Sequence, residues 1–447
     1  MNARRAAQFA ILTMLFLFVF THSRIQGQND WSRFVAVESL VRDGTLDIDR
    51  WLDRQPNHGK SPEGVYVLND MVFNRVDGHF YSSKPPVYTL ILAGVMWPFK
   101  ELGADLDITR LGAASAPAVF ILTWLVVGTV SACAFYFFRK KVGESVGGKD
   151  ADLITVLTLG GTLFLSYSVT MNHHTFTAAL VLISFFLLGM AEASPRAKDG
   201  GAAAAGFLMG LAVVTDIGPG VAFSIGFGLY IIFYLRSLRT LLVFGFWSIG
   251  PLAVHCVVQY MTFNSILPVQ LIGGTKDYPG SYWSHEVGPD TWQIPRTYYW
   301  LLTLFSARGL FVLSPILLVG AGALARDIGH VLRLRSADRT QAGRGYAALA
   351  VLFGMAFLFF YHSFIAPTNF CGSCFGFRWY IGFTPLLAFY AARGYTWCRA
   401  TPGRRKVFYV LGVISVMCAL VGMQGPWLLM ENNPLPPVRI LMLLRGF

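Results

Sequence analysis

Charged residues are scarce in this sequence. Asp, Glu, Lys and Arg make up 13% of its 447 residues, whereas a soluble domain carries about 25%. Because the deficit is spread over many long apolar runs, it excludes an ordinary soluble domain and indicates a polytopic membrane protein. The apolar runs are continuous and lack the alternation of a barrel strand. Helices and closed barrels both satisfy every backbone polar group in lipid, and these runs favour helices.

A signal-peptide cleavage site is also missing. Arg4 and Arg5 precede an apolar run over residues 10–20, and no small-x-small pattern follows that run. We therefore expect the run to remain as the first transmembrane helix, with its N-terminus in the cytoplasm. The sequence shows no clear internal repeat and no sizeable soluble segment after its last apolar run. Residues 1–447 are expected to form a single transmembrane domain.

Cysteines are few, with six in the chain. Cys133, Cys256 and Cys418 lie in apolar runs, where a cysteine usually behaves as an inert packing residue. Cys371 and Cys374 form a C-x-x-C in a short polar stretch. Such a pair can form a disulfide if the stretch faces an oxidising compartment, but the spacing alone is a weak signal. The sequence leaves this disulfide open.

The net charge is +12, and its placement argues against a nucleic-acid partner. Basic residues gather in short clusters between apolar runs, for example Arg139-Lys140-Lys141, as the positive-inside rule expects. Hydropathy predicts about eleven transmembrane helices, with the basic loops on the cytoplasmic side of the plasma (inner) membrane. The two largest polar loops, residues 29–86 and 264–308, are then expected outside the cytoplasm.

The loop of residues 29–86 is the longest polar stretch of the chain, and we expect it to carry the chemistry. Residues 32–42 place apolar side chains at helical spacing and are followed by Gly44. They predict a short amphipathic helix at the membrane surface. An extended piece is expected near residues 65–73, followed by a turn at Asp77-Gly78.

Asp30 and Lys84 stand near the two ends of this loop. A carboxylate at a membrane surface can act as a general base, particularly where partial burial raises its pKa. The alternative for Asp30 is a solvated loop acid. A lysine that precedes re-entry into the membrane can bind a phosphate as a point charge. The alternative for Lys84 is an interfacial lysine that extends its amine to water.

Arg308 and Arg378 each begin an apolar segment on the outer side. Two arginines at the same depth and at helix starts suggest an anion site, aided by backbone N–H groups. They could equally be interface anchors beside aromatic residues. His173 and His174 could bind a phosphate or a sugar, or simply end a helix. Because adjacent histidines point apart on a helix, we do not expect them to bind a metal together.

The outer loop resembles the first outer loop of a group of membrane enzymes. The residues concerned are Asn29-Asp30-Trp31-Ser32-Arg33-Phe34 and Asp77-Gly78-His79-Phe80-Tyr81-Ser82-Ser83-Lys84-Pro85-Pro86. An acid followed by x-x-Arg-aromatic, and a closing Lys-Pro-Pro, are similar to the polytopic glycosyltransferases with the C-type fold. These include protein O-mannosyltransferase-like enzymes and bacterial aminoarabinose transferases. They usually have Asp-Glu where this chain has Asp30-Trp31. The single carboxylate favours a single-base mechanism and weakens any metal proposal.

The resemblance implies an all-α enzyme that transfers a sugar from a polyprenyl-phosphate-linked donor. The acceptor would be a glycan, lipid or protein outside the cytoplasm, and the anomeric carbon would be inverted. Asp30 would take the proton of the acceptor, and Lys84, Arg308 and Arg378 would bind the departing phosphate. The residues expected to contact the substrates are Arg33, Tyr81, His173, His174 and Asn369.

Cofactor use and two other functions are also considered. No cofactor is expected, but a divalent metal is left open. Asp47 and Asp49 would share one face of a strand and could bind a metal, although we expect them to face water. The alternative function is a transporter or flippase of a lipid-linked sugar. That class often shows internal repeats and charges at mid-membrane, and neither is clear here. A structural subunit would give the acid-rich loop no purpose.

Overall fold

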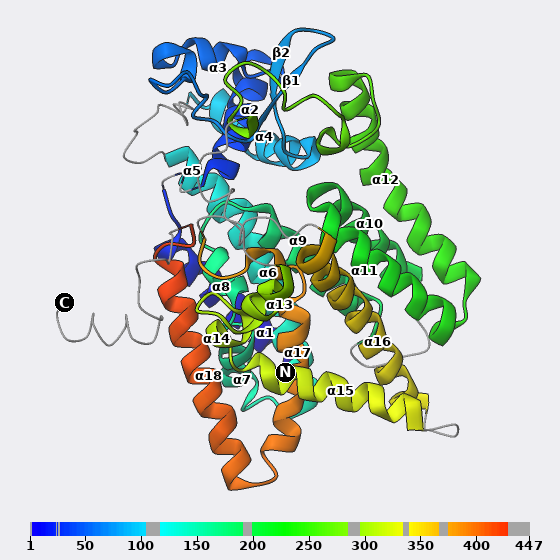
Figure 1. The fold of residues 1–447 in the computed structure, drawn as a ribbon. Helices are drawn as coiled ribbons and strands as arrows, with labels where there is room; N and C mark the ends of the chain where they lie inside the picture. Colours follow the sequence, from blue (N-terminus) through cyan, green and yellow to red (C-terminus); the bar gives the residue numbers. More distant parts are fainter. Residues whose placement is uncertain are drawn as a thin grey trace, which may run out of the picture.

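The computed structural model describes residues 2–23, 25, 27–103, 117–190, 199–284, 296–333, 339–365 and 374–427. Within these ranges the regular secondary structure is helical apart from one two-stranded hairpin. Figure 1 shows a small cap at the top of the view and a larger body of helices below it. The predicted all-α architecture is therefore confirmed.

The cap elements lie between the first helix of the chain and the long helices of the body. They are α2 (Gln28–Asp43), α3 (Asp49–Asp53), the 3-10 helix η1 (Pro56–Gly59), β1 (Met71–Asn74), β2 (His79–Ser82) and α4 (Pro86–Glu101). The body is built from α1 (Asn2–Phe20), α5 (Pro117–Leu122), α6 (Thr129–Val146), α7 (Ala151–Thr158), α8 (Leu163–Tyr167), α9 (His173–Leu187), α10 (Asp199–Thr215), α11 (Ile217–Tyr230), α12 (Leu238–Phe263), α13 (Arg296–Phe305), α14 (Leu310–Leu313), α15 (Leu317–Arg333), α16 (Arg339–Phe360), α17 (Thr384–Cys398) and α18 (Pro402–Met423). Three π-helical segments extend the body helices, namely η2 (Thr123–Gly128), η3 (Ile231–Leu235) and η7 (Tyr361–Ile365).

Six helices of the described chain are long and apolar enough to cross a membrane, so the protein is a multi-pass membrane protein. They are Ala3–Phe20, Pro117–Val146, Ile217–Leu235, Leu238–Phe263, Arg339–Phe364 and Pro402–Met423. A seventh candidate is the pair Thr297–Leu313 and Leu317–Val331, which is bent by 100°. The predicted count of about eleven is not confirmed. Hydropathy counts apolar residues and does not register breaks: residues 153–168 fall in two short helices, α7 and α8, separated at Gly160 and Gly161.

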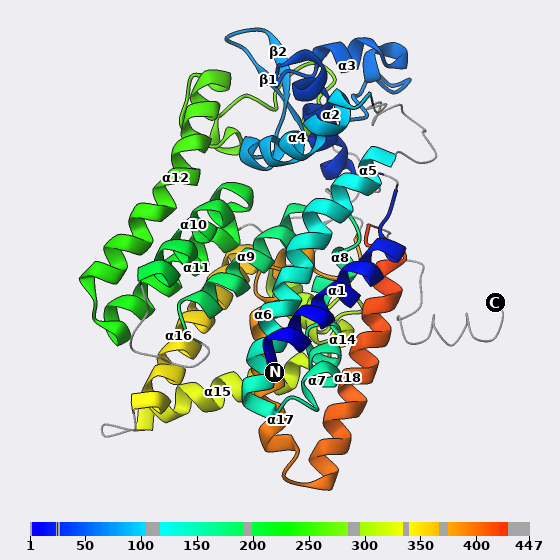
Figure 2. The ribbon, with the colours of Figure 1, turned by 180° about the vertical axis from the view of Figure 1, so that it is seen from behind.

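Small residues hold α10 against α12. A Cβ added to Gly206 would lie 2.1 Å from the Phe244 carbonyl oxygen, and one added to Gly210 would lie 2.4 Å from that of Ser248. The Ser248 hydroxyl donates to the Gly206 carbonyl at 2.9 Å. Lipid gives helices little hydrophobic incentive to associate, so such close backbone contact is a usual way to pack them. Figure 2 shows α12 beside α10, and α1 running along α6.

Helix α2 is the element on which the cap is built. Phe34 and Val37 belong to the core of the body, whereas Val35 and Ala36 belong to a separate small core in the cap. The helix ends, as predicted, at Gly44, which has a φ of +73°. The helix was predicted to lie on the membrane surface. Instead, apolar residues of two cores cover α2 on both sides. The polar side chains of Asp30, Ser32 and Arg33 are therefore buried.

Residues 264–284, from the second large polar loop, complete the cap. Tyr278 packs in the small core of the cap. The backbone N–H of Tyr66 donates to the Gly280 carbonyl at 2.9 Å, and that of Phe73 donates to the Thr275 carbonyl at 2.8 Å. The two polar segments that hydropathy separates by several apolar runs thus form one unit.

Strands β1 and β2 form an antiparallel hairpin in which Met71 lies opposite Ser82. The turn falls at Asp77-Gly78, as predicted, and Gly78 has a φ of +81°, which suits glycine. The hairpin brings Asp70, which precedes β1, beside Lys84, which follows β2.

Candidate active site

Asp30 lies in the first turn of α2, where the cap meets the body. Only 2% of the residue is exposed, and its Oδ1 atom lies 3.9 Å from Nη1 of Arg33. Its Oδ2 atom is buried and has no hydrogen-bond partner among the described residues. Burial raises the pKa of Asp30 to about 7, against the opposing effect of the charges on Arg33, Arg378 and Lys84. A carboxyl group that titrates near neutral pH is well suited to take a proton from a substrate.

Lys84 is held by a second buried acid, Asp70. Its Nζ atom lies 3.0 Å from Oδ2 of Asp70, and the backbone N–H of Ser83 donates to the Asp70 carbonyl at 2.9 Å. Ser32 of α2 donates to the same carbonyl, which ties the hairpin to the helix that carries Asp30. Burial lowers the pKa of Lys84, and the Asp70 carboxylate counteracts that effect. Lys84 is thus a half-buried ammonium group held by Asp70 and not a lysine extended to water.

Arg33 connects three elements of the site. The residue is completely buried, and its Nη2 atom lies 3.3 Å from Nδ1 of His173 at the start of α9. Its guanidinium carbon lies 4.8 Å from the ring centre of Tyr88 in α4. The Tyr88 hydroxyl in turn donates to the Asn172 carbonyl at 3.3 Å. Arg33 is therefore fixed between the cap and the body, beside the carboxylate of Asp30.

His173 and His174 lie together, which corrects the prediction that they point apart. Their ring centres are 4.0 Å apart and the ring planes are tilted by 38°. Both residues belong to the first turn of α9, after the N-cap residue Asn172, and although neighbouring Cβ atoms diverge on a helix, the two long imidazole side chains bend into contact. Each ring has its own partner: Arg33 binds His173, and Oδ2 of Asp216 lies 2.6 Å from Nδ1 of His174.

Arg378 reaches the site from the other end of the chain. It begins the 3-10 helix η8 (Arg378–Tyr380), and its guanidinium carbon lies 4.8 Å from the ring centre of Trp427. The same indole packs on Gly27, because a Cβ added there would lie 3.1 Å from it. The charge of Arg378 lowers the pKa of Asp30. The structure thus brings together Asp30, Arg33, Lys84, His173, His174 and Arg378, which the sequence predicted separately.

The remaining predicted site residues are placed differently. Arg308 is buried between α13 and α14, and its link to Asp30 stays a prediction. Tyr81 lies in β2, where its hydroxyl donates to Oδ2 of Asp77 at 2.8 Å and its ring packs against that of Phe263 in α12. A narrow pocket nevertheless has both Tyr81 and Lys84 in its wall. Asn369 lies outside the described residues, as does Cys371.

Two groups of side chains have the composition of a metal site. They are His173, His174 and Asp216, and Asp47, Asp49 and His79; within each group the ligand atoms lie within 4.8 Å of one another. In the first group Arg33 can only donate, so Nδ1 of His173 must accept and Nε2 carries the proton of the neutral ring. In that tautomer Nε2 offers a metal no lone pair. These contacts neither establish nor exclude a metal.

Two residues of the site, Asp70 and Asp216, were not predicted to take part in it. Asp70 forms an ion pair with Lys84, and the carboxylate of Asp216 contacts Nδ1 of His174. Asp216 stands alone between two apolar runs, α10 and α11, and an isolated acid in that position was a signal that could have been used. Nothing in the local sequence distinguishes Asp70 from the other acids of the loop.

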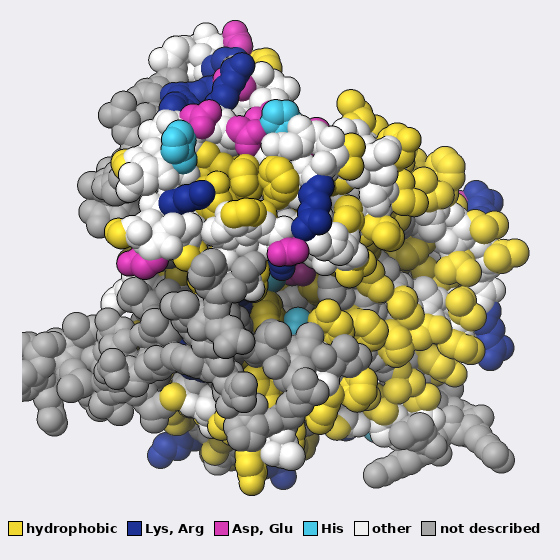
Figure 3. Space-filling model, turned by 45° about the horizontal axis from the view of Figure 1, so that its top comes forward, with side chains coloured by type: hydrophobic (Ala, Val, Ile, Leu, Met, Phe, Trp, Pro, Cys, Tyr) yellow, Lys and Arg dark blue, Asp and Glu magenta, His cyan; other side chains and the backbone are white. Residues whose placement is uncertain are grey.

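Charge is concentrated where this site lies. Figure 3 views the molecule with the cap turned forward, and acidic, basic and histidine side chains gather on the cap and at its lower edge. Apolar side chains cover the flank of the body in the same view. The site thus lies between a polar cap and an apolar surface suited to lipid.

Comparison with solved structures identifies the fold. The oligosaccharyltransferase from Archaeoglobus fulgidus, in the apo form, superimposes with a TM-score of 0.51 at 12% identity, over 98% of this chain and 59% of that one. The chain has the fold of this membrane enzyme. The same protein in complex with zinc and sulfate gives a TM-score of 0.51 over 95% of this chain. ArnT from Cupriavidus metallidurans, in the apo state, is also similar, with a TM-score of 0.48, 15% identity, and coverage of 90% of this chain and 61% of that one.

The polytopic C-type fold predicted from the outer-loop motif is therefore confirmed. No family model and no curated protein sequence matches the chain. The chain spans 53% to 61% of the length of the solved structures named above. At identities this low, the likeness to the oligosaccharyltransferase establishes the fold alone, and the chemistry has to be argued from the site itself.

Proposed function

We propose that the protein is a membrane glycosyltransferase. It would transfer a sugar from a polyprenyl-phosphate-linked donor to an acceptor outside the cytoplasm, at the plasma (inner) membrane. The observation that supports this most directly is Asp30, a buried carboxyl group whose pKa is raised to about 7 among Arg33, Lys84 and Arg378. A base beside several fixed cations suits a reaction that removes a proton from one reactant and releases an anion from the other.

The reaction would proceed as one displacement. The Asp30 carboxylate takes the proton of an acceptor hydroxyl or amine, and the acceptor atom bonds to the anomeric carbon on the face opposite the phosphate. The carbon–oxygen bond to the phosphate breaks at the same time, so the configuration inverts and the polyprenyl phosphate leaves with one more negative charge. Lys84 and Arg378 would stabilise that charge, and Arg308 is proposed to assist them. Such groups act without reorganisation because the fold already holds them in place.

The other residues would position the reactants. Arg33 keeps a positive charge 3.9 Å from Asp30, which favours the carboxylate form needed for proton removal. His174 donates from Nδ1 to Asp216, so its Nε2 atom can accept a hydrogen bond from a sugar hydroxyl. Tyr81, His173 and Asn369 are proposed to contact the substrates. The transporter alternative gains no support, because the buried charges of the site gather at the junction of cap and body.

Transfer can be measured directly. Purified protein in vesicles is supplied with a labelled polyprenyl-phosphate sugar and a mixture of extracytoplasmic glycans, lipids and peptides. Release of free polyprenyl phosphate together with a labelled acceptor would support the proposal. Movement of the intact labelled lipid across the bilayer, without loss of its sugar, would instead support a flippase. Mass spectrometry of cells with and without the gene would name the substrates, as one lipid-linked sugar that accumulates beside one glycan that is lost.

The rate of transfer should depend on pH through Asp30. The base must be ionised, and its pKa is raised to about 7. Below that pH, kcat/KM should fall about tenfold for each unit, and above it the value should level off. The measurement is a pH profile of kcat/KM in vesicles, with protein integrity checked at each pH. A profile that stays level down to about pH 5 would exclude Asp30 as the base.

Asp216 is proposed to orient His174. Asp216→Ala removes the acceptor of the Nδ1–H group, and kcat should fall roughly 10- to 100-fold, the usual effect of losing a hydrogen bond to a charged group. Asp216→Asn retains an oxygen acceptor and should recover most of the rate. A purely structural role predicts instead that both variants lose thermal stability in proportion to their activity. Rates and melting temperatures measured on the same samples separate the two cases.

A further inference from the structure

A second polar site lies at the opposite end of the body from Asp30. It is a pocket of about 500 Å³ between α6, α15, α16 and α17. Figure 1 shows α15 and the adjoining ends of α16 and α17 far from the cap. This is the side that we propose to face the cytoplasm, so the pocket cannot serve the sugar-transfer site.

The wall of the pocket carries an excess of positive charge. Its charged residues are Lys141, Glu144, Arg326, Asp327, Arg344 and Arg393, with His330 beside them. Two ion pairs balance part of this charge: Arg393 with Asp327, and Lys141 with Glu144, each at 3.0 Å. Arg326 and Arg344 have no carboxylate partner in the part of the chain that the structure describes, and both are exposed to the pocket mouth.

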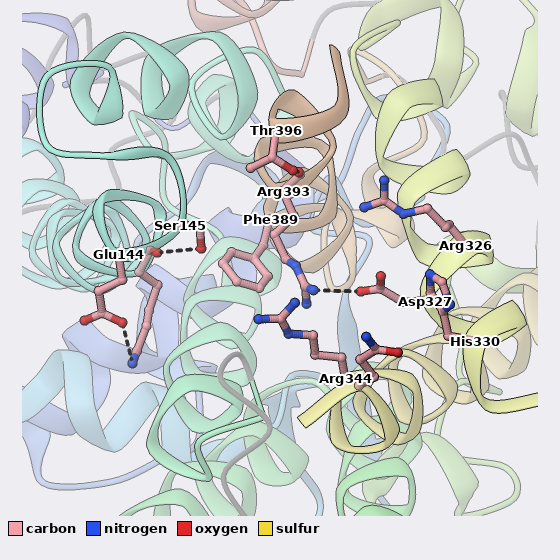
Figure 4. A pocket seen from close by; sticks show the side chains of 11 residues that line it. Glu144, Ser145, Arg326, Asp327, His330, Arg344, Phe389, Arg393 and Thr396 are labelled. Carbon is pink, nitrogen blue, oxygen red and sulfur yellow. Dashed lines mark hydrogen bonds and ion pairs between the residues drawn. The ribbon is translucent and has the colours of Figure 1, made fainter. Parts of the chain in front are cut away.

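The floor of the pocket presents an unused hydrogen-bond donor. The side chains of Arg393 and Asp327 are 11% and 8% exposed. Their ion pair uses Nη2 of Arg393, and Nη1 is buried without a hydrogen-bond partner among the described residues. Figure 4 shows the guanidinium groups of Arg326, Arg344 and Arg393 directed into the space between α15, α16 and α17. A buried donor of this kind is unfavourable unless a ligand accepts from it.

The positive-inside rule alone does not account for this arrangement. That rule explains basic residues on the surface of a loop, such as Arg405 and Lys406 at the exposed start of α18. It does not explain why three arginines from three helices surround one cavity, where like charges repel. An anion would offset the repulsion and satisfy the free donors. Guanidinium groups bind phosphate oxygens with two parallel hydrogen bonds, which makes phosphate the anion that best fits three arginines.

We propose that this pocket binds a phosphate group at the cytoplasmic side of the membrane. The phosphate would belong either to an anionic lipid headgroup or to a soluble phosphate compound. Basic pockets between transmembrane helices on that side are suited to anionic headgroups. The proposal does not depend on the sugar-transfer reaction, since no residue of the pocket belongs to the Asp30 site.

The test compares two variants with equal loss of charge. Arg326→Gln/Arg344→Gln removes both unpaired arginines and leaves the Arg393–Asp327 pair intact. Arg405→Gln/Lys406→Gln removes two exposed charges outside the pocket. Native mass spectrometry measures binding of phosphatidylglycerol and of phosphatidylcholine to each purified protein. Isothermal titration measures binding of inorganic phosphate. Size-exclusion elution and melting temperature confirm that each variant is folded.

Binding to the pocket variant should fall about 25-fold, since each of the two basic residues near a membrane surface contributes about fivefold, while the control variant should bind like the unmodified protein. A loss confined to phosphatidylglycerol assigns the site to a lipid headgroup, and a loss confined to inorganic phosphate assigns it to a soluble compound. Either result supports the proposal. Equal weakening in both variants would show non-specific attraction, and unchanged binding in the pocket variant would show that the pocket is not a phosphate site. Both results overturn the proposal.

Discussion

Asp30→Asn is expected to lower the rate of sugar transfer by about 10²- to 10⁴-fold, the range attributed to a general base. The amide cannot take the acceptor proton, but it has the size and shape of the carboxyl group. It therefore leaves Arg33, 3.9 Å away, and the rest of the site in place. The measurement is initial transfer rate in vesicles, with donor binding determined separately. Donor binding should persist, because Asp30 does not contact the phosphate in the proposed reaction.

The same variant should fold at least as well as the unmodified protein. A pKa raised from 3.8 to about 7 means that burial penalises the charged form of Asp30. The penalty is absent below pH 3.8, grows as pH rises, and is complete above about pH 7, where it approaches about 4 kcal/mol. Asn carries no such charge, so the melting temperature at about pH 8 should not fall. Full activity in the variant would refute the assignment of the base.

A matched control is available on the same helix. Asp43 lies at the far end of α2 and forms an ion pair with the exposed Arg50 at 2.8 Å. Asp43→Asn makes the same chemical change away from the site and should leave the rate within about twofold, because exposed ion pairs contribute little. A comparable loss of activity in both variants would indicate that acidity of the cap in general, and not Asp30, is required.

Lys84→Met should lower the transfer rate by about 100- to 1,000-fold, because it removes one of the cations that stabilise the departing phosphate. Most of the loss should appear in kcat, since the negative charge on the phosphate develops as the bond to the sugar breaks. The rate is measured with saturating donor, so that weaker donor binding does not contribute. A variant that reaches the normal kcat at high donor concentration would exclude this role.

The change also leaves Asp70 buried without its partner, which destabilises a protein by about 3–5 kcal/mol. A second variant separates this effect from catalysis. Lys84→Met/Asp70→Asn removes both charges of the pair, 3.0 Å apart, and should recover the melting temperature but not the rate. Lys100→Met, at the far end of α4, serves as the control for loss of a lysine. Recovery of activity in the double variant would show that Lys84 acts only through folding.

Parts of this site were predictable because the signal is local. Asp30 and Lys84 stand near the ends of one polar loop, and the turn at Asp77-Gly78 and the end of α2 at Gly44 follow from glycine conformation. The number of spans was less predictable, because breaks such as Gly160-Gly161 interrupt apolar runs without making them polar. The prediction that His173 and His174 point apart was wrong, because the directions of neighbouring Cβ atoms on a helix do not fix where two imidazole rings lie.

Residue order was enough to establish a helical membrane protein with two large polar loops, because apolar runs of sufficient length have few other stable arrangements in lipid. The properties of the site came from packing. Two cores enclose α2 and bury Asp30, which raises its pKa. Asp70 meets Lys84 across a hairpin, and Asp216 meets His174 across 42 residues. Burial and ion pairing depend on contacts between distant segments, and these exist only once the chain has folded.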